Sequence, residues 1–140
     1  MKRLVTAVSV GILALGVCAY AAVDWARDYK SALAQAGKEK KIVMVDLYAD
    51  WCGPCKMLDR LTFTNADVQA VLSKDFVAVK LNIEGSRENR DLAAQFNTDA
   101  IPHIIFLDSS GKKLSDIVGF FPADQFLDEL RKVTEKAAKK

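Results

Sequence analysis

Residues 46–56 read DLYADWCGPCK, and the two cysteines in this stretch decide how the rest of the chain is interpreted. Cys52 and Cys55 are separated by two residues. This spacing fits a structural disulfide, half of a metal site, or a pair that exchanges electrons with other proteins. The residues around the pair have to distinguish these three kinds of chemistry.

A metal site has the least support from the composition. A structural zinc site usually takes four ligands from Cys and His, and outside residues 1–21 the chain offers only this pair and His103, some fifty residues away. Covalent haem attachment requires a histidine directly after the second cysteine, where this chain has Lys56. We therefore predict no metal and no cofactor apart from the cysteine pair itself.

A purely structural disulfide would add little to the stability of the fold. In the loop-entropy model the stabilisation grows with the length of the closed loop, from about 3 kcal/mol for 15 residues, so a bridge across two residues contributes less. The pair is poorly suited to that task.

The surrounding pattern suits redox chemistry better. Residues 41–49, KIVMVDLYA, form a nearly continuous apolar run that predicts a strand covered on both faces, and a helix follows it. Cys52 would then lie at a helix N-terminus, where unpaired N–H groups and the helix dipole stabilise a thiolate. Cys55 lies one turn further on and can attack a mixed disulfide on Cys52. Gly53 permits a tight turn, and Pro54 is tolerated in the first helical turn.

Alternating strand and helix signals extend over the rest of the chain. Trp25, Tyr29 and Leu33 recur at helical spacing after Asp24, which predicts a helix capped by Asp24 and ended by Gly37. The further expected elements are a cysteine-bearing helix to about Leu61 that is interrupted at 62–64, a short helix capped by Asn65, a strand at 76–83, a helix capped by Ser86, a strand at 101–108, a turn at 109–111, a strand at 112–120 and a last helix from Pro122. These elements predict one α/β domain over residues 22–140, with a central mixed four-stranded sheet and helices on both faces.

The first 21 residues have the layout of a secretory signal peptide. Lys2 and Arg3 precede an apolar run of about 14 residues and the small-residue pattern Ala-Tyr-Ala at 19–21. We expect cleavage after residue 21, with a retained membrane anchor and lipidation of Cys18 as alternatives. Cleavage leaves 18 basic and 18 acidic residues, a net charge of zero that gives no reason to expect a nucleic-acid partner.

Taken together, these residues resemble the thioredoxin family. WCGPCK at 51–56 is similar to the thioredoxin active site, and Ile101-Pro102 is similar to its cis-proline loop. Asp46 stands at the position of the family's buried aspartate, Lys80 resembles the lysine beside it, and Gly119 resembles the late glycine near the substrate surface. Arg60 replaces the proline that kinks the thioredoxin active-site helix, and Asp59 adds a charge next to it.

A closer resemblance is to the C-terminal periplasmic thioredoxin-like domain of the DsbD-type conductors, which pass electrons from the cytoplasm to periplasmic partners. The stretches VDLYADWC, LTFTNADVQ and GFFPADQF carry it. The resemblance implies a periplasmic reductase of protein disulfides that receives electrons from a separate membrane thiol–disulfide protein, and we expect it to be a monomer.

The same resemblance implies roles for individual residues. Cys52 and Cys55 would perform the exchange, Asp46 would relay a proton to Cys55, and Lys80 would tune that relay. A carboxylate in an apolar strand is costly to bury, which independently favours a functional Asp46. The substrate-binding residues would be Trp51, Gly53, Pro54, Ile101, Pro102 and Gly119, with the Ile101 backbone pairing with a bound substrate strand. For His103 a structural role is favoured over a catalytic one.

Two alternatives to the reductase remain open. An oxidase or isomerase would use the same residues at a higher reduction potential. A binding module would keep the fold without catalysis.

Overall fold

Five strands form one mixed sheet in the computed structural model, which describes residues 22–139. Residues 1–21, and with them the predicted signal peptide and Cys18, lie outside the described part of the chain. The elements are β1 (Trp25–Ala26), α1 (Tyr29–Glu39), β2 (Ile42–Tyr48), α2 (Gly53–Met57), the π-helix η1 (Leu58–Thr62), α3 (Ala66–Asp75), β3 (Phe76–Asn82), α4 (Arg87–Gln95), β4 (His103–Leu107), β5 (Lys113–Val118) and α5 (Ala123–Ala138).

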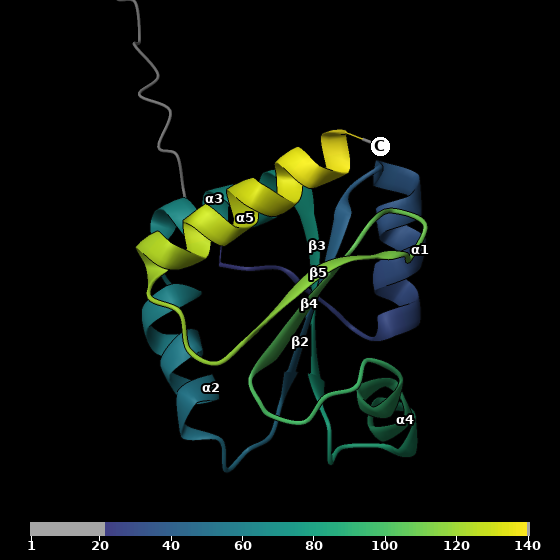
Figure 1. Cartoon of the computed structure of the whole chain (residues 1–140), viewed down its shortest axis with the longest axis vertical. Helices are drawn as coiled ribbons and strands as arrows, with labels where there is room; N and C mark the ends of the chain where they lie inside the picture. The colour runs from purple at the N-terminus through teal and green to yellow at the C-terminus, as the bar shows by residue number, and fades with distance from the viewer. Residues whose placement is uncertain (1–21, 140) are drawn as a thin grey trace, which may run out of the picture.

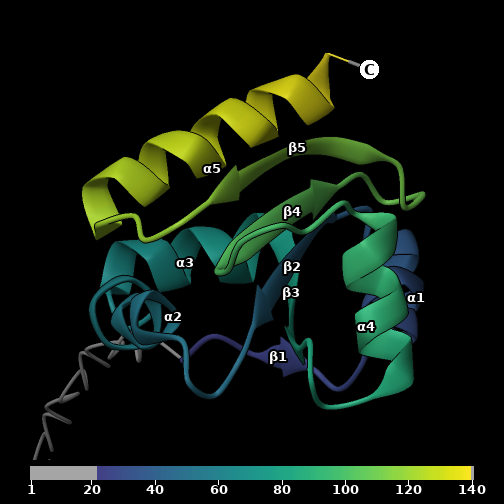
Figure 2. The same cartoon turned by 60° about the horizontal axis from the view of Figure 1, so that its bottom comes forward.

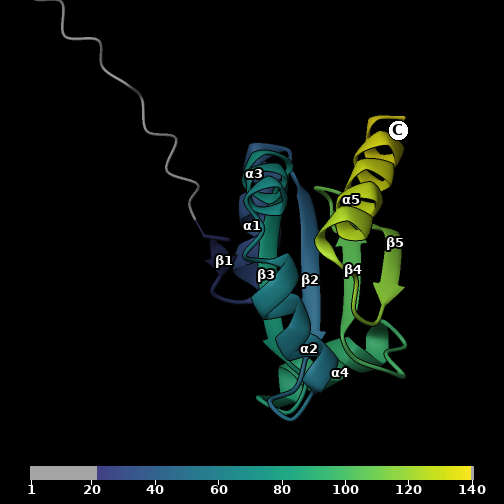
Figure 3. The same ribbon diagram turned by 90° about the vertical axis from the view of Figure 1, so that its left-hand side faces the viewer.

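The strand order across the sheet is β1-β3-β2-β4-β5, which Figure 3 shows from one edge to the other. β1 and β2 both run parallel to β3, whereas β4 is antiparallel to β2 and to β5. The predicted mixed sheet with helices on both faces is confirmed, but the predicted number of four strands is wrong. The additional strand is β1, which extends the sheet by pairing with β3.

Alternating side chains of the central strands divide the core into two layers. Ile42 and Met44 of β2 pack in one apolar cluster with residues of η1, α3 and α5, whereas Val43 and Val45 pack in another with residues of α1 and α4. Figures 1 and 2 show α2, α3 and α5 on one side of the sheet and α1 and α4 on the other. By the same alternation, Asp46 faces the side that carries the cysteine helix.

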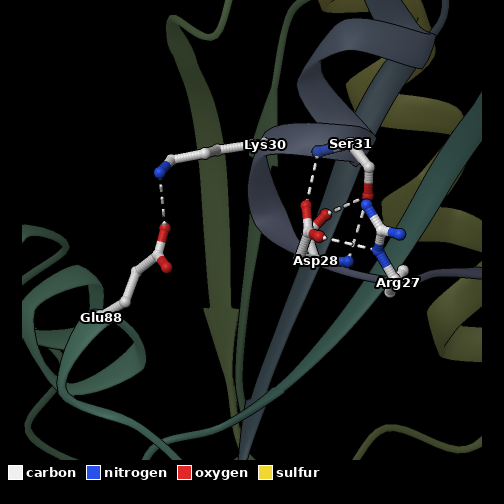
Figure 4. A network of polar contacts seen from close by, with 5 residues as sticks. All are labelled: Arg27, Asp28, Lys30, Ser31 and Glu88. Carbon is white, nitrogen blue, oxygen red and sulfur yellow. Dashed lines mark hydrogen bonds and ion pairs between the residues drawn. The ribbon is translucent and has the colours of Figure 1, made fainter.

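The first helix begins later than the spacing of apolar residues predicts. Asp28, not Asp24, caps α1: its side chain accepts a hydrogen bond from the Ser31 N–H, and the Ser31 hydroxyl accepts one from the Asp28 N–H, which is a capping box. Figure 4 shows this cap and the ion pair of Lys30 with Glu88, which joins α1 to α4. The helix also continues through Gly37 and ends at Glu39, followed by the C-cap residue Lys40, whose φ is 57°.

The other predicted helix ends agree better with the structure. The Asn65 and Ser86 side chains accept hydrogen bonds from the first turns of α3 and α4, and Pro122 precedes α5, so all three predicted starts are confirmed. The cysteine helix is shorter than expected, because α-helical geometry ends at Met57 and a π-helical turn follows it. In this turn the Phe63 N–H donates to the Leu58 carbonyl, five residues earlier.

Candidate active site

Cys52 and Cys55 form a disulfide at the start of α2. Cys52 is the N-cap residue, and its Sγ accepts a hydrogen bond of 3.2 Å from the Cys55 backbone N–H. Both residues are buried, with 2% of each exposed. A sulfur that accepts from the first turn of a helix is in a position that stabilises negative charge, because the N–H groups there lack intrahelical partners.

The residues beside the pair form its exposed surroundings. The Trp51 side chain is exposed, and its indole N–H donates to Glu84 Oε1 at 3.0 Å. Pro54 lies in the first turn of α2, where its missing N–H leaves no hydrogen bond unmade. Gly53 is exposed, and a Cβ built on it would meet no atom within 4 Å, so packing does not require glycine there.

Asp46 and Lys80 meet on the side of the sheet that faces α2. They are directly opposed in the parallel pairing of β2 and β3, and Lys80 Nζ lies 2.9 Å from Asp46 Oδ2. The Asp46 side chain is fully buried, which excludes a solvent-facing aspartate at a strand edge. Among the described residues, its Oδ1 atom has no hydrogen-bond partner.

The two partners of this ion pair have pKa values raised for different reasons. Burial raises the pKa of the Asp46 carboxyl, and the attraction of the Lys80 ammonium only partly offsets it. For Lys80, burial acts to lower the pKa, but the carboxylates of Asp46 and Asp59 outweigh it and the net direction is upward. Both directions are physically consistent, because Asp46 is fully buried whereas Lys80 is partly exposed and has two carboxylate partners.

Asp59 is a member of this cluster that sequence reasoning did not place in the site. Its Oδ1 lies 2.6 Å from Lys80 Nζ, so the ammonium bridges two carboxylates. The ring centroids of Tyr48, Trp25 and Phe63 lie 4.5, 5.6 and 5.7 Å from Nζ. The sequence feature that could have indicated a role for Asp59 is its position four residues after Cys55, which places both residues on one face of a helix.

The loop before β4 is far from the cysteine helix in the sequence but lies next to Trp51 in space. The Ile101–Pro102 peptide bond is cis, and the Pro102 carbonyl accepts a 2.8 Å hydrogen bond from the Gly119 N–H. Gly119 has φ 100°, a conformation that favours glycine. A cleft of about 250 Å³ is lined by Trp51, Ile83 and residues 98–101.

A family model described as thioredoxin-like matches residues 24–109, more than half of the chain. The chain belongs to the thioredoxin-like family. The predicted resemblance and fold class are thereby confirmed, apart from the number of strands.

Named relatives of this thioredoxin-like chain include thiol:disulfide interchange protein DsbD of Actinobacillus pleuropneumoniae, which is 42% identical over 95 residues. That match covers 66% of this chain and 16% of the relative, so the chain spans about one sixth of the relative's length. Among solved structures, a thioredoxin from Thermus thermophilus gives a TM-score of 0.75 at 25% identity, with 84% of this chain and 91% of that chain covered. The oxidised C-terminal domain of Neisseria meningitidis DsbD gives 0.63 at 26% identity, with 74% and 90% covered.

Residues 22–139 contain no group of three or more His, Cys, Asp or Glu side chains placed to hold a metal ion. No helix in that range combines the length and apolar character that crossing a membrane requires. The expectation that the protein needs no metal stays a prediction.

Proposed function

We propose that the protein is an exported thiol–disulfide oxidoreductase that reduces disulfides of periplasmic proteins through Cys52 and Cys55. The observation that carries the proposal is the disulfide at the start of α2, in which the sulfur of Cys52 accepts a helix N-terminal N–H. The similarity to interchange proteins of the DsbD type supports the same chemistry.

The proposed cycle begins from the reduced pair. The Cys52 thiolate attacks one sulfur of a substrate disulfide and forms a mixed disulfide, and the other substrate sulfur leaves as a thiolate. Cys55 then loses its proton and attacks Cys52 Sγ, which releases the second substrate thiolate. Two electrons have then passed to the substrate, whose two thiolates take up protons from solvent, and the Cys52–Cys55 disulfide remains.

Asp46 is the proposed proton acceptor for Cys55, directly or through water. Its carboxylate lies on the face of the sheet towards α2. Lys80 donates a hydrogen bond to Oδ2, whereas Oδ1 has no hydrogen-bond partner among the described residues. A raised pKa makes a carboxylate a better proton acceptor at neutral pH. Lys80 holds the carboxylate in place and stabilises its charge.

The substrate-binding surface is proposed to lie along the cleft beside Trp51. The backbone of Ile101 would pair with an extended substrate segment, with Pro102 and Gly119 holding that loop, and Gly53 and Pro54 would contact the substrate beside the cysteine pair. These roles suit protein disulfides, because an extended peptide supplies the backbone partner.

The location and the electron donor complete the proposal. Residues 1–21 would direct export to the periplasm, with cleavage, lipidation or retention as an anchor. A membrane thiol–disulfide protein would then reduce the Cys52–Cys55 disulfide, and the protein would act as a monomer.

Trapping of mixed disulfides tests this function. In cells that produce Cys55→Ser protein, the resolving step is lost and substrate proteins should accumulate on Cys52, where non-reducing gels and mass spectrometry identify them. Cys52→Ser protein is the matched control and should trap nothing. Equal trapping by both variants, or none by either, would contradict the proposed order of attack.

A further inference from the structure

His103 follows the cis-proline directly and makes a polar connection that the proposed exchange chemistry does not use. It is the first residue of β4, with 2% of its surface exposed. Its Nε2 lies 2.8 Å from Asp116 Oδ2 on β5, and its Nδ1 lies 2.8 Å from the Thr98 hydroxyl in the loop after α4. One buried ring therefore links the edge strand of the sheet to that loop.

The chemistry of Asp116 fixes the direction of its hydrogen bond with His103. Burial acts to raise the pKa of Asp116, but the hydrogen bonds from His103 and from Lys113, whose Nζ lies 3.0 Å from Oδ1, outweigh it and the net direction is downward. A carboxylate only accepts, so Nε2 carries the proton and donates to Asp116. Nδ1 and the Thr98 hydroxyl form the second hydrogen bond of the ring, at 2.8 Å.

The tethered loop is also a wall of the proposed substrate cleft. Residues 98–101 line that cleft together with Trp51 and end at the cis Ile101–Pro102 bond. The loop has a second attachment, from the Thr98 N–H to the Ala93 carbonyl at 2.9 Å, but this bond joins it only to α4. The His103–Thr98 bond is the one of these two contacts that ties the loop to the sheet.

We propose that His103 is a positioning residue: through Thr98 and Asp116 it fixes the loop of residues 98–101 against the sheet and thereby sets the affinity for peptide disulfides. The proposal rests on the proposed function for its substrate class. The group that it positions is a binding wall, so loss of the tether weakens the binding of a peptide that fills the cleft. A small disulfide that reaches only the cysteines depends on it much less.

Thr98→Val is the most specific variant, because it removes the hydroxyl group and keeps the β-branched shape of the side chain. Thr134→Val is its matched control, since that hydroxyl donates to the Leu130 carbonyl within α5 and has no contact with the loop. His103→Gln removes the ring itself. The double variant Thr98→Val/His103→Gln tests whether the two side chains act through one hydrogen bond.

The kinetic readout compares insulin with a small aryl disulfide as oxidised substrates of the reduced protein. Thr98→Val and His103→Gln should each raise KM for insulin about fivefold, the change expected from one lost hydrogen bond, with kcat unchanged. Both should raise KM for the aryl disulfide much less than KM for insulin, and the double variant should be no worse than either single one. An unchanged KM for insulin, or an equal loss on both substrates, would overturn the proposal.

A second readout is independent of activity. In the oxidised protein, the amide of residue 98, which donates to the Ala93 carbonyl, should lose about fivefold of its protection against hydrogen exchange in Thr98→Val and not in Thr134→Val. If the protein reduces neither substrate, the proposed function fails, and this exchange measurement still decides whether His103 tethers the loop. Unchanged exchange in Thr98→Val would refute the tether.

Discussion

Asp46→Asn gives the most informative perturbation of the buried charge beside the cysteines. The substitution keeps the shape of the side chain and removes a fully buried charge with one unpartnered oxygen, while Lys80 keeps Asp59 at 2.6 Å. Removal of the charge abolishes a desolvation penalty of several kcal/mol. Lys80 forms a weaker hydrogen bond with an amide than with a carboxylate, and this difference removes about 1.5–3 kcal/mol of the gain in stability. We expect the variant to be more stable by about 1–2 kcal/mol at pH 8.

The sign of the pH dependence follows from the raised pKa of Asp46. A carboxyl whose folded pKa exceeds its unfolded value contributes its full stability below the unfolded pKa, about 3.9, and loses it as the pH rises through the folded pKa. The advantage of Asp46→Asn should therefore grow between pH 4 and pH 8.

Urea unfolding of the oxidised wild-type protein and the oxidised variant at both pH values measures this advantage. Subtracting the two unfolding free energies at each pH cancels the other titrating groups. A difference that stays constant with pH, or that favours the wild type more at pH 8, would refute the assignment of a buried charge.

Three further substitutions test individual contacts. Asp59→Asn should lower the pKa of Asp46, because the negative charge of Asp59 helps to raise that pKa. NMR titration of the Asp46 carboxyl carbon measures the shift. An unchanged pKa of Asp46 would exclude Asp59 from the cluster. Asp28→Ala removes the cap of α1 and should lower the unfolding free energy by about 1 kcal/mol, whereas the exposed Glu88→Gln should change it by less than about 0.5 kcal/mol. Leu58→Ala should cost about 2–5 kcal/mol because the side chain is fully buried; a loss below about 1 kcal/mol would contradict its place in the core.

Sequence patterns predicted the parts of the fold that depend on local chemistry. The apolar runs of β2, β3 and β4 mark strands covered on both faces, and Asn65 and Ser86 supply cap oxygens whose partners lie within three residues. These features need no knowledge of distant residues.

The errors came from places where tertiary contacts override a local pattern. Trp25 continues the helical spacing of Tyr29 and Leu33, but its backbone pairs with Ala78 of β3 and its ring contacts Phe63. The sequence alone could not reveal that strand pairing and ring packing of Trp25 prevail over its helical spacing.

The candidate site divides in the same way. The cysteine pair and its helix N-terminus follow from one contiguous stretch, whereas the cis bond before Pro102 could be expected only from the family resemblance. The contacts of Asp59 with Lys80 and of His103 with Thr98 and Asp116 depend on how the helices and loops pack on the sheet.

The equilibrium reduction potential of the Cys52–Cys55 pair tests the central claim most directly. The purified protein is equilibrated with glutathione or a dithiol buffer, and the oxidised fraction is counted by alkylation. A reductase should give a value between about −270 and −230 mV, close to that of thioredoxin. A value above about −180 mV would contradict the proposed direction of electron flow and indicate an oxidase or an isomerase, and a pair that does not exchange at all would indicate a binding module.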